Sequence, residues 1–266
     1  MDRRQIAIRN NVRIRGEGSK TLLFAHGFGC EQRIWEPVIE ALSNSYKIVT
    51  FDYVGCGESD FSNYISKRYD SLKGYAQDLT EVVQTLGLTD ITLVAHSVSG
   101  SIASLAYPEL ANKVSKIVML NPSPRYIHDL PSYESGFSRS DVDELMVLME
   151  QNFFQWAEYM SPKVMENSDT PQLAETLESY FTAGDAQLTR NFAKATFYSD
   201  VRDTLPKLKC PVLILQAKAD IVVPLKVSEY MAEILPLAKL VVMDARGHYP
   251  QLSAPKLVAQ YISEFV

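Results

Sequence analysis

Cysteine is scarce in this chain of 266 residues, which has only Cys30, Cys56 and Cys210. Their number is odd, they lie far apart, and none belongs to a CxxC pair or to a spacing typical of zinc ligands. These features argue against a disulfide framework and against a structural metal site. We expect reduced thiols of the kind found in the cytoplasm, and we expect no metal and no other cofactor.

The chain also lacks a long basic run and a long apolar run. Lys and Arg number 26 against 32 Asp and Glu, a formal net charge of -6, which offers no phosphate-binding surface for nucleic acid. No stretch of about 18 apolar residues is present, and the first residues are charged and lack the apolar segment of a signal peptide. We therefore expect a soluble, cytoplasmic protein with no nucleic-acid partner and no membrane partner, and we take a monomer as the default.

Apolar runs are plentiful, and they alternate with helical patterns in the order typical of a mostly parallel sheet. The runs are TLLFAHG, YKIVTFD, ITLVAHS, VSKIVML, CPVLILQA and AKLVVMD. Ahead of them, residues 4–16 alternate apolar and polar side chains and predict an antiparallel hairpin at one sheet edge. Residues 71–87 predict a helix that Gly87 ends. With 46% hydrophobic residues, the chain suits one large α/β domain with an insertion.

The insertion is the one region that breaks the alternation. It has no long β-run, and its segment SDVDELMVLMEQNFFQWAEYM predicts one long amphipathic helix capped by Ser140 or Asp141. A helical insertion after the sixth expected strand is typical of a cap over the carboxyl edge of the sheet, where such sheets bind ligands. We predict a core domain of residues 1–123 and 198–266 and a helical cap of residues 124–197.

A serine stands where a buried strand is expected to turn into a helix. Residues 91–103, ITLVAHSVSGSIA, start as a strand, pass through Ser97 and continue in small residues that suit a closely packed helix. A sharp turn here lifts the serine hydroxyl clear of the sheet, as a nucleophile requires. The usual pattern is G-x-S-x-G, but Ala95 and Ser99 replace both glycines, so we expect a slightly splayed turn. The alternative is a serine that only caps the helix.

Two later segments supply partners for Ser97 in the chain order Ser, Asp, His. Asp220 follows the expected strand CPVLILQA, and His248 follows the last expected strand, AKLVVMD. We predict that His248 takes the proton of Ser97 as general base and that Asp220 orients the imidazole. Asp52 comes too early in the chain for this role and Asp244 lies too close to His248, so neither is expected to join the triad.

An acyl-transfer site also needs backbone N–H donors for the oxyanion. We predict one donor at Val98, directly after the serine, and the other at Phe28 in the segment FAHGFGCEQRIW, which follows an early strand. Cys30 lies beside this loop, but no sharp turn presents it and no base is placed for it. A thiol nucleophile is therefore not expected.

Eight segments spread over nearly the whole chain carry a resemblance to known proteins. They are HGFGCEQRIW (26–35), FDYVGCGESD (51–60), YAQDL (75–79), HSVS (96–99), NPSPRY (121–126), NFAKATFYSDVRDTL (191–205), LILQAKADIVVP (213–224) and ARGHYP (245–250). The chain resembles the α/β-hydrolase superfamily, and within it the RsbQ-type proteins, bacterial stress-signalling partners of a PAS-domain phosphatase. Those proteins are in turn similar to the strigolactone and karrikin receptors of plants.

The resemblance implies an α/β-hydrolase fold: a mostly parallel central sheet with an N-terminal antiparallel hairpin, helices on both faces and a helical cap insertion. It also implies a hydrophobic ligand cavity, because five aromatic residues match cavity-lining positions of the family: Phe28, Tyr126, Phe137, Trp156 and Phe197. Taken alone, the aromatic residues of the insertion would more often form cap core, and Phe153, Phe154 and Tyr159 are expected to do so.

Two functions of different classes agree with these residues. In the first, the protein is a serine hydrolase that cleaves a small hydrophobic ester or lactone through an acyl-enzyme intermediate. In the second, it is a sensor that binds or slowly cleaves such a ligand and signals through its cap to a regulatory protein, by resemblance a PAS-domain phosphatase. A serine at position 97 argues against the dehalogenase and epoxide hydrolase chemistry of relatives that use an aspartate nucleophile.

Overall fold

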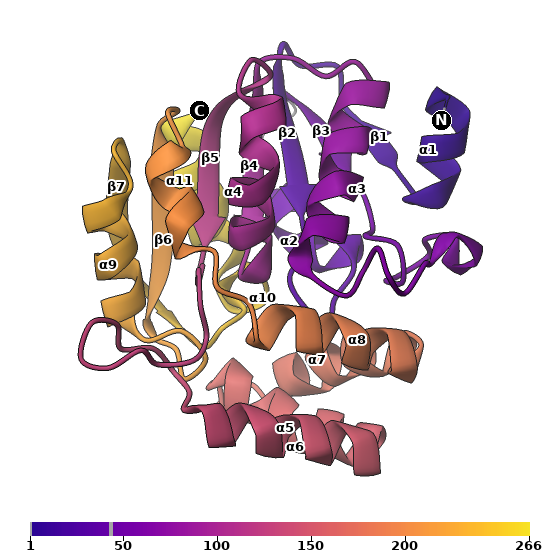
Figure 1. The fold of residues 1–266 in the computed structure, drawn as a ribbon. Helices are drawn as coiled ribbons and strands as arrows, with labels where there is room; N and C mark the ends of the chain where they lie inside the picture. Colours follow the sequence, from indigo (N-terminus) through magenta and orange to yellow (C-terminus); the bar gives the residue numbers. More distant parts are fainter. Residues whose placement is uncertain (1, 43–44) are drawn as a thin grey trace.

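A seven-stranded sheet forms the centre of the computed structural model, which describes residues 2–42 and 45–266. The strand order is β1-β3-β2-β4-β5-β6-β7, and every pairing is parallel except that of β1 with β3 (Figure 1). The strands are β1 Arg13–Arg15, β2 Lys20–Ala25, β3 Tyr46–Thr50, β4 Ile91–His96, β5 Val114–Leu120, β6 Val212–Ala219 and β7 Ala238–Arg246. The α/β-hydrolase fold expected from the sequence is confirmed in this mostly parallel sheet.

Helices cover both faces of the sheet, which explains why its central strands contain long apolar runs. Every residue of β4 is buried. The covering helices are α2 Glu36–Ala41, α3 Leu72–Thr85, α4 Val98–Leu110, α9 Leu225–Ile234, α10 Pro250–Ser253 and α11 Pro255–Phe265, with short 3-10 turns at η1 Gln32–Trp35, η2 Phe61–Asn63 and η3 Arg202–Lys207. Helix α3 packs on α4, and α11 packs on α2. The helix predicted for residues 71–87 is confirmed as α3, and Gly87 follows it with a φ of +65°.

The predicted N-terminal hairpin is wrong. Its first half is a helix, α1 Arg3–Arg9, and only its second half is a strand, β1, which pairs with β3. Asp2 and Gln5 form a reciprocal capping box that satisfies backbone groups at the start of α1. These local hydrogen bonds override the alternating pattern, and Ile6 is buried while Ile8 is 57% exposed.

The insertion forms a helical cap beneath the carboxyl ends of the strands (Figure 1). Its helices are α5 Arg139–Gln151, α6 Phe153–Met165, α7 Gln172–Ala183 and α8 Ala186–Phe197. The cap follows the fifth strand rather than the sixth, because the first expected strand is a helix. The exact limits of the cap as a domain, residues 124–197, stay a prediction.

The single long helix predicted for the cap is also wrong, because the chain breaks at Asn152. This residue has an extended backbone, with φ −152° and ψ 91°, and its side chain caps α6 by accepting the N–H of Gln155 at 3.1 Å. The cap of α5 is Ser138 rather than Ser140 or Asp141; Asp141 instead completes a capping box with Ser138.

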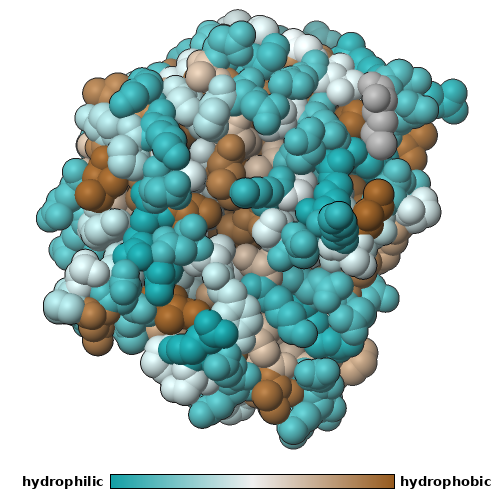
Figure 2. Space-filling model, viewed as in Figure 1, coloured by the Kyte–Doolittle hydropathy of each residue, from teal (hydrophilic) through white to brown (hydrophobic). Residues whose placement is uncertain are grey.

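The surface is mostly hydrophilic on the face drawn in Figure 2, with hydrophobic side chains scattered over it. On the cap, Phe154 and Tyr159 are 65% and 54% exposed, so the expectation that they belong to its core is wrong, whereas Phe153 is buried. Within the described residues, no helix combines the length and the hydropathy needed to cross a membrane.

Candidate active site

Ser97 occupies a strained turn between β4 and α4. Its φ is +55° and its ψ is −122°, a backbone conformation that residues other than glycine rarely adopt. The strain turns the chain sharply from strand to helix, as in the nucleophile turn of serine hydrolases. Ala95, where the usual pattern has glycine, is fully buried in β4 between Ala25 and Met119 of the neighbouring strands.

Ser99, at the second glycine position, ties this turn to its neighbours. Its hydroxyl donates a hydrogen bond to the carbonyl oxygen of His26 at 2.5 Å and lies 2.9 Å from the hydroxyl of Tyr53. His26 belongs to the loop after β2 that also carries Phe28. The serine side chain therefore links the start of α4 to the predicted oxyanion loop, a contact that glycine could not make.

The side chains of Ser97, His248 and Asp220 form one chain of hydrogen bonds. Nε2 of His248 lies 2.7 Å from Oγ of Ser97, and Nδ1 lies 2.7 Å from Oδ2 of Asp220. The other carboxylate oxygen, Oδ1, accepts the N–H groups of Val222 and Val223 at 2.8 and 3.0 Å. All three side chains are buried, and that of Asp220 has no exposed surface. The arrangement can pass the proton of Ser97 to the imidazole while the carboxylate fixes its tautomer.

The backbone of His248 is held from two sides. Its N–H donates to the carbonyl oxygen of Val164, at the end of α6, at 2.7 Å. Its carbonyl oxygen accepts a hydrogen bond from Nε2 of His96 at 2.8 Å. Burial lowers the pKa of His96 well below its usual range, so this ring stays neutral and donates through Nε2. Both the cap and the end of β4 thus position the imidazole.

Phe28 and Val98 lie where the sequence predicts the oxyanion donors. Phe28 follows β2, and Val98 is the first residue of α4. In residues 2–42 and 45–266, neither backbone N–H has an acceptor, so both are free to bind a ligand oxygen. Their role as an oxyanion hole stays a prediction.

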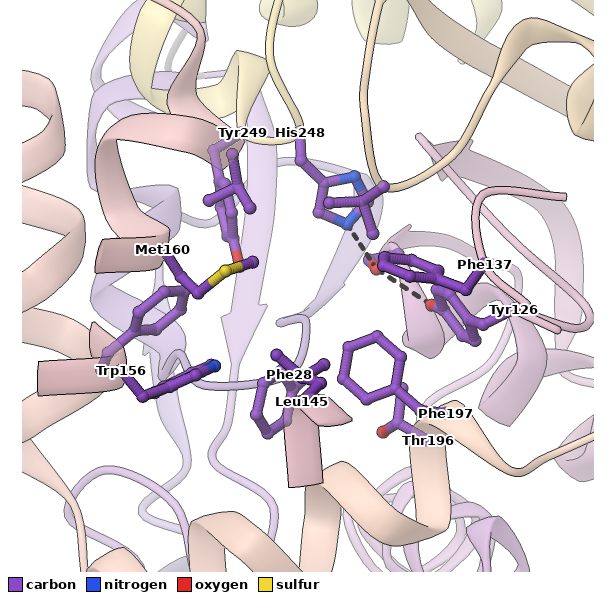
Figure 3. Close-up of a pocket in the computed structure, with 14 residues that line it drawn as sticks. Phe28, Tyr126, Phe137, Leu145, Trp156, Met160, Thr196, Phe197, His248 and Tyr249 are labelled. Atoms are coloured by element: carbon purple, nitrogen blue, oxygen red, sulfur yellow. Dashed lines mark hydrogen bonds between the residues drawn. The ribbon is translucent and has the colours of Figure 1, made fainter. Parts of the chain in front are cut away.

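An apolar cavity lies between these groups and the cap (Figure 3). The space that the centres of water-sized molecules can occupy is about 40 Å³. The five aromatic residues predicted for the cavity all line it, together with seven further residues that sequence reasoning missed: Leu145, Met160, Val164, Phe181, Thr196, Val222 and Tyr249. Thr196 and Tyr249 are the chain neighbours of the predicted residues Phe197 and His248, and this adjacency is the one feature of the sequence that indicates a place in the cavity wall for them.

Besides Ser97 and His248, the cavity is lined by four residues with polar side-chain groups: Tyr126, Trp156, Thr196 and Tyr249. The hydroxyl of Tyr126 lies 3.1 Å from Oγ of Ser97. Nε1 of Trp156 and Oγ1 of Thr196 are buried and have no hydrogen-bond partner within the described part of the chain. Figure 3 shows the indole nitrogen of Trp156 turned toward the middle of the cavity.

The other acidic and thiol side chains have structural roles. Asp52 is buried and accepts the backbone N–H groups of Gln32 and Glu58 at 2.8 and 3.0 Å. Asp244 is exposed and pairs with Lys218. Burial raises the pKa of the Cys30 thiol well above its usual range, which disfavours a nucleophilic thiolate. Among the residues that the structure describes, no cluster of His, Cys, Asp and Glu could hold a metal ion.

Comparison with known proteins agrees with this fold over most of the chain. The family model of the alpha/beta hydrolase fold matches residues 20–255. Karrikin insensitive 2 receptor CA of Petunia hybrida is 35% identical over 254 residues, which cover 94% of this chain and 92% of that protein. Strigolactone esterase RMS3 of Pisum sativum is 32% identical, with 95% of this chain and 94% of that protein covered.

A solved structure is also very similar. It is that of a hydrolase from Oleispira antarctica, with a TM-score of 0.97 and 38% sequence identity, and it covers 100% of this chain and 97% of its own. The sheet with its helical cap, the family match and these relatives together show that the chain belongs to the α/β-hydrolase fold family and is related to the strigolactone and karrikin receptors.

Proposed function

We propose that this protein is a serine hydrolase that cleaves a small, hydrophobic ester or lactone. The observation that carries the proposal is the unbroken chain of hydrogen bonds from Ser97 through His248 to Asp220, at 2.7 Å for each step, on the wall of an apolar cavity. Such a chain is the arrangement that activates a serine hydroxyl at neutral pH.

The reaction proceeds through an acyl-enzyme. Oγ of Ser97 attacks the substrate carbonyl carbon as its proton passes to Nε2 of His248, and the electron pair of the C=O bond moves onto the oxygen. The N–H groups of Phe28 and Val98 bind that oxyanion. When the carbonyl re-forms, the bond to the alkoxy oxygen breaks and His248 gives its proton to it. Water, activated by His248, then hydrolyses the acyl-enzyme in the same way.

The cavity favours a neutral substrate. Apart from His248, the described residues that line it include no ionisable side chains other than tyrosines, so a charged ligand would lose its hydration without gaining a counter-ion. The unpaired polar atoms of Trp156 and Thr196 favour a ligand that has another oxygen besides that of the carbonyl group attacked by Ser97. The indole N–H can only donate, so that oxygen must be a hydrogen-bond acceptor such as an ether or a carbonyl.

The sensor function is the second candidate, and two observations favour it. Relatives at 32–35% identity bear the names of a karrikin receptor and of a strigolactone esterase. The cap also exposes Phe154 and Tyr159, two large aromatic side chains of α6 that a regulatory protein could cover. The partner expected from the sequence resemblance is a PAS-domain phosphatase. In this function, slow cleavage of the ligand would serve signalling to that partner.

Hydrolysis of short-chain p-nitrophenyl esters and of a simple butenolide lactone, compared between wild type and Ser97→Ala, tests both functions. Mass spectrometry detects any adduct on Ser97 or His248. Rapid turnover that Ser97→Ala abolishes supports the hydrolase, and a single turnover that leaves a covalent adduct supports the sensor. If wild type and Ser97→Ala behave identically, without activity or adduct, the proposal is wrong.

A further inference from the structure

The hydroxyl of Tyr126 has one hydrogen-bond partner within the described part of the chain, Oγ of Ser97 at 3.1 Å. Tyr126 is 1% exposed, so its hydroxyl has no access to bulk water. Other contacts fix the position of Tyr126. Its carbonyl oxygen accepts a hydrogen bond from the hydroxyl of Ser135 at 2.6 Å, and its ring packs on that of Phe197 with the ring centroids 5.2 Å apart. Figure 3 shows the two hydrogen bonds that meet at the serine oxygen, one with the imidazole of His248 and one with the phenol of Tyr126.

The direction of each hydrogen bond follows from the carboxylate of Asp220, the last group in the series of hydrogen bonds that starts at Tyr126. The carboxylate of Asp220 accepts two backbone N–H groups at Oδ1 and acts as the acceptor at Oδ2 as well, so the hydrogen of the imidazole of His248 lies on Nδ1. Nε2 is then an acceptor and takes the single hydrogen of the Ser97 hydroxyl. The phenol of Tyr126 is therefore the donor in its hydrogen bond with Ser97.

The phenol is a donor that keeps its proton. Burial raises the pKa of Tyr126 above its usual range, so the phenol stays neutral and does not compete with His248 as a base. As the proton of Ser97 leaves, negative charge grows on Oγ. A hydrogen bond to a charged oxygen is stronger than one to a neutral oxygen, so the bond from the phenol strengthens as the attack begins.

We propose that Tyr126 is a further catalytic residue, whose phenol donates a hydrogen bond to Oγ of Ser97 and stabilises that oxygen as it becomes the nucleophile. This inference rests on the proposed function of Ser97. It adds a side-chain donor, supplied by the cap, to the two backbone donors of Phe28 and Val98. The cap would then take part in the chemistry as well as cover the cavity.

The test measures the reactivity of Ser97 without turnover. A p-nitrophenyl alkylphosphonate reacts once: the bond from Oγ to phosphorus forms, the bond from phosphorus to the aryl oxygen breaks, and p-nitrophenolate is released while His248 takes the serine proton. Wild type, Tyr126→Phe and the control Tyr133→Phe are compared. Tyr133 is a buried residue of the same segment whose hydroxyl donates to the carbonyl of Arg125 at 2.8 Å, away from the cavity.

We expect Tyr126→Phe to lower the second-order rate of phosphonylation about tenfold or more, as loss of a donor to a reacting oxygen does. Tyr133→Phe should stay within about twofold of wild type. Thermal unfolding of each variant shows whether it is folded, and kcat/KM for p-nitrophenyl acetate should fall with the phosphonylation rate.

Equal or faster phosphonylation of a folded Tyr126→Phe variant would overturn this inference and leave the hydrolase function intact. An equal loss in Tyr126→Phe and Tyr133→Phe would also overturn it, because it would show a purely structural effect. If wild type gives no adduct on Ser97, the inference and the proposed function both fail. A folded Tyr126→Phe variant that loses reactivity while Tyr133→Phe retains it supports the role of the phenol.

Discussion

At the scale of single residues, the turn at Ser97 forms although neither neighbouring glycine is present. The serine has a φ of +55° with Ala95 two residues before it and Ser99 two residues after it. Ala95 fits because its methyl group is completely buried within the sheet. Ser99 fits because its hydroxyl bonds to the loop after β2. These contacts hold the turn together, and the slight splay expected from the sequence stays a prediction.

Restoring the usual glycine at position 95 should cost stability and gain no activity. Ala95→Gly removes a buried methyl group and adds backbone freedom to the unfolded chain, and we expect the free energy of unfolding to fall by about 1–2 kcal/mol. The rate of ester hydrolysis should stay within about twofold, because Ser97 already has the required backbone conformation. Urea unfolding and steady-state kinetics measure the two effects. A large gain in rate would show that the methyl group distorts the turn.

Removing the hydroxyl of Ser99 should lower both stability and activity. Ser99→Ala leaves the carbonyl oxygen of His26 and the hydroxyl of Tyr53 with one partner fewer, which costs about 1–3 kcal/mol of unfolding free energy. We expect kcat/KM to fall about tenfold, because the loop that bears Phe28 loses its link to the serine turn.

The matched control for Ser99→Ala is Ser101→Ala on the same helix. Ser101 is 2% exposed and donates to the carbonyl oxygen of Ser123 at 2.7 Å. We expect a similar loss of stability with kcat/KM nearly unchanged. If the two variants lose the same activity, the link between Ser99 and the loop after β2 has no catalytic effect.

At the scale of elements, the end of cap helix α6 is joined to the loop that carries His248. The carbonyl oxygen of Val164 accepts the N–H of His248, and the side-chain amide of Asn167 donates to the carbonyl oxygen of Arg246 at 3.2 Å. Between these contacts lies Gly247, with a φ of +81°, where an added Cβ would sit 2.0 Å from the carbonyl oxygen of Met165. The close approach of the two backbones therefore requires glycine.

Substitution of this glycine should disrupt the contact between cap and core. Gly247→Ala forces the backbones apart, and we expect a loss of about 3 kcal/mol or more in unfolding free energy together with at least a tenfold loss of kcat/KM. The control is Gly87→Ala, which has a φ of +65° but no atom within 4 Å of the new Cβ. It should cost only about 1–2 kcal/mol and leave activity unchanged. Equal losses in the two variants would contradict the proposed role of close packing.

At the scale of the whole molecule, two buried imidazoles couple folding to pH. Burial lowers the pKa of His26 and lowers that of His96 well below its usual range. The unfolded chain binds protons at both histidines below a pH of about 6.5, whereas the folded protein does not. The stability that these groups contribute is therefore present above this pH and is lost as the pH falls toward their folded pKa values.

The free energy of unfolding should accordingly decrease between a pH of about 7 and about 5. The slope is at most about 1.4 kcal/mol per pH unit for each histidine. Asp78 has the opposite effect on the free energy of unfolding. Burial raises the pKa of its carboxyl group, so the folded protein binds a proton there at a higher pH than the unfolded chain does. The histidine contribution is therefore read from the difference between wild type and His96→Gln in urea unfolding at several pH values. Parallel slopes for the two proteins would contradict the prediction.

The mostly parallel sheet, the cap and the family could be predicted because they depend on patterns within short segments. The apolar run of β4 and the helical spacing of α3 both have the expected structure. Residues 3–9 and Asn152 differ from the sequence prediction because two local hydrogen-bonding motifs, the capping box at Asp2 and the Asn152 cap, override apolar spacing. The exposure of Phe154 and Tyr159 could not be predicted either, because the face that a cap helix buries depends on where its neighbours pack.

Apolar runs and chain order are properties of the sequence, so they suffice to predict a serine after one buried strand and an aspartate and a histidine after two later strands. The contacts that those residues make depend on the tertiary structure. Ser97 and His248 are 151 residues apart in the chain, yet Oγ of Ser97 lies 2.7 Å from Nε2 of His248. The phenol of Tyr126, at the start of the insertion, contacts the same serine oxygen. The physical reason is that such contacts are set by the packing of sheet and cap, which no segment contains on its own.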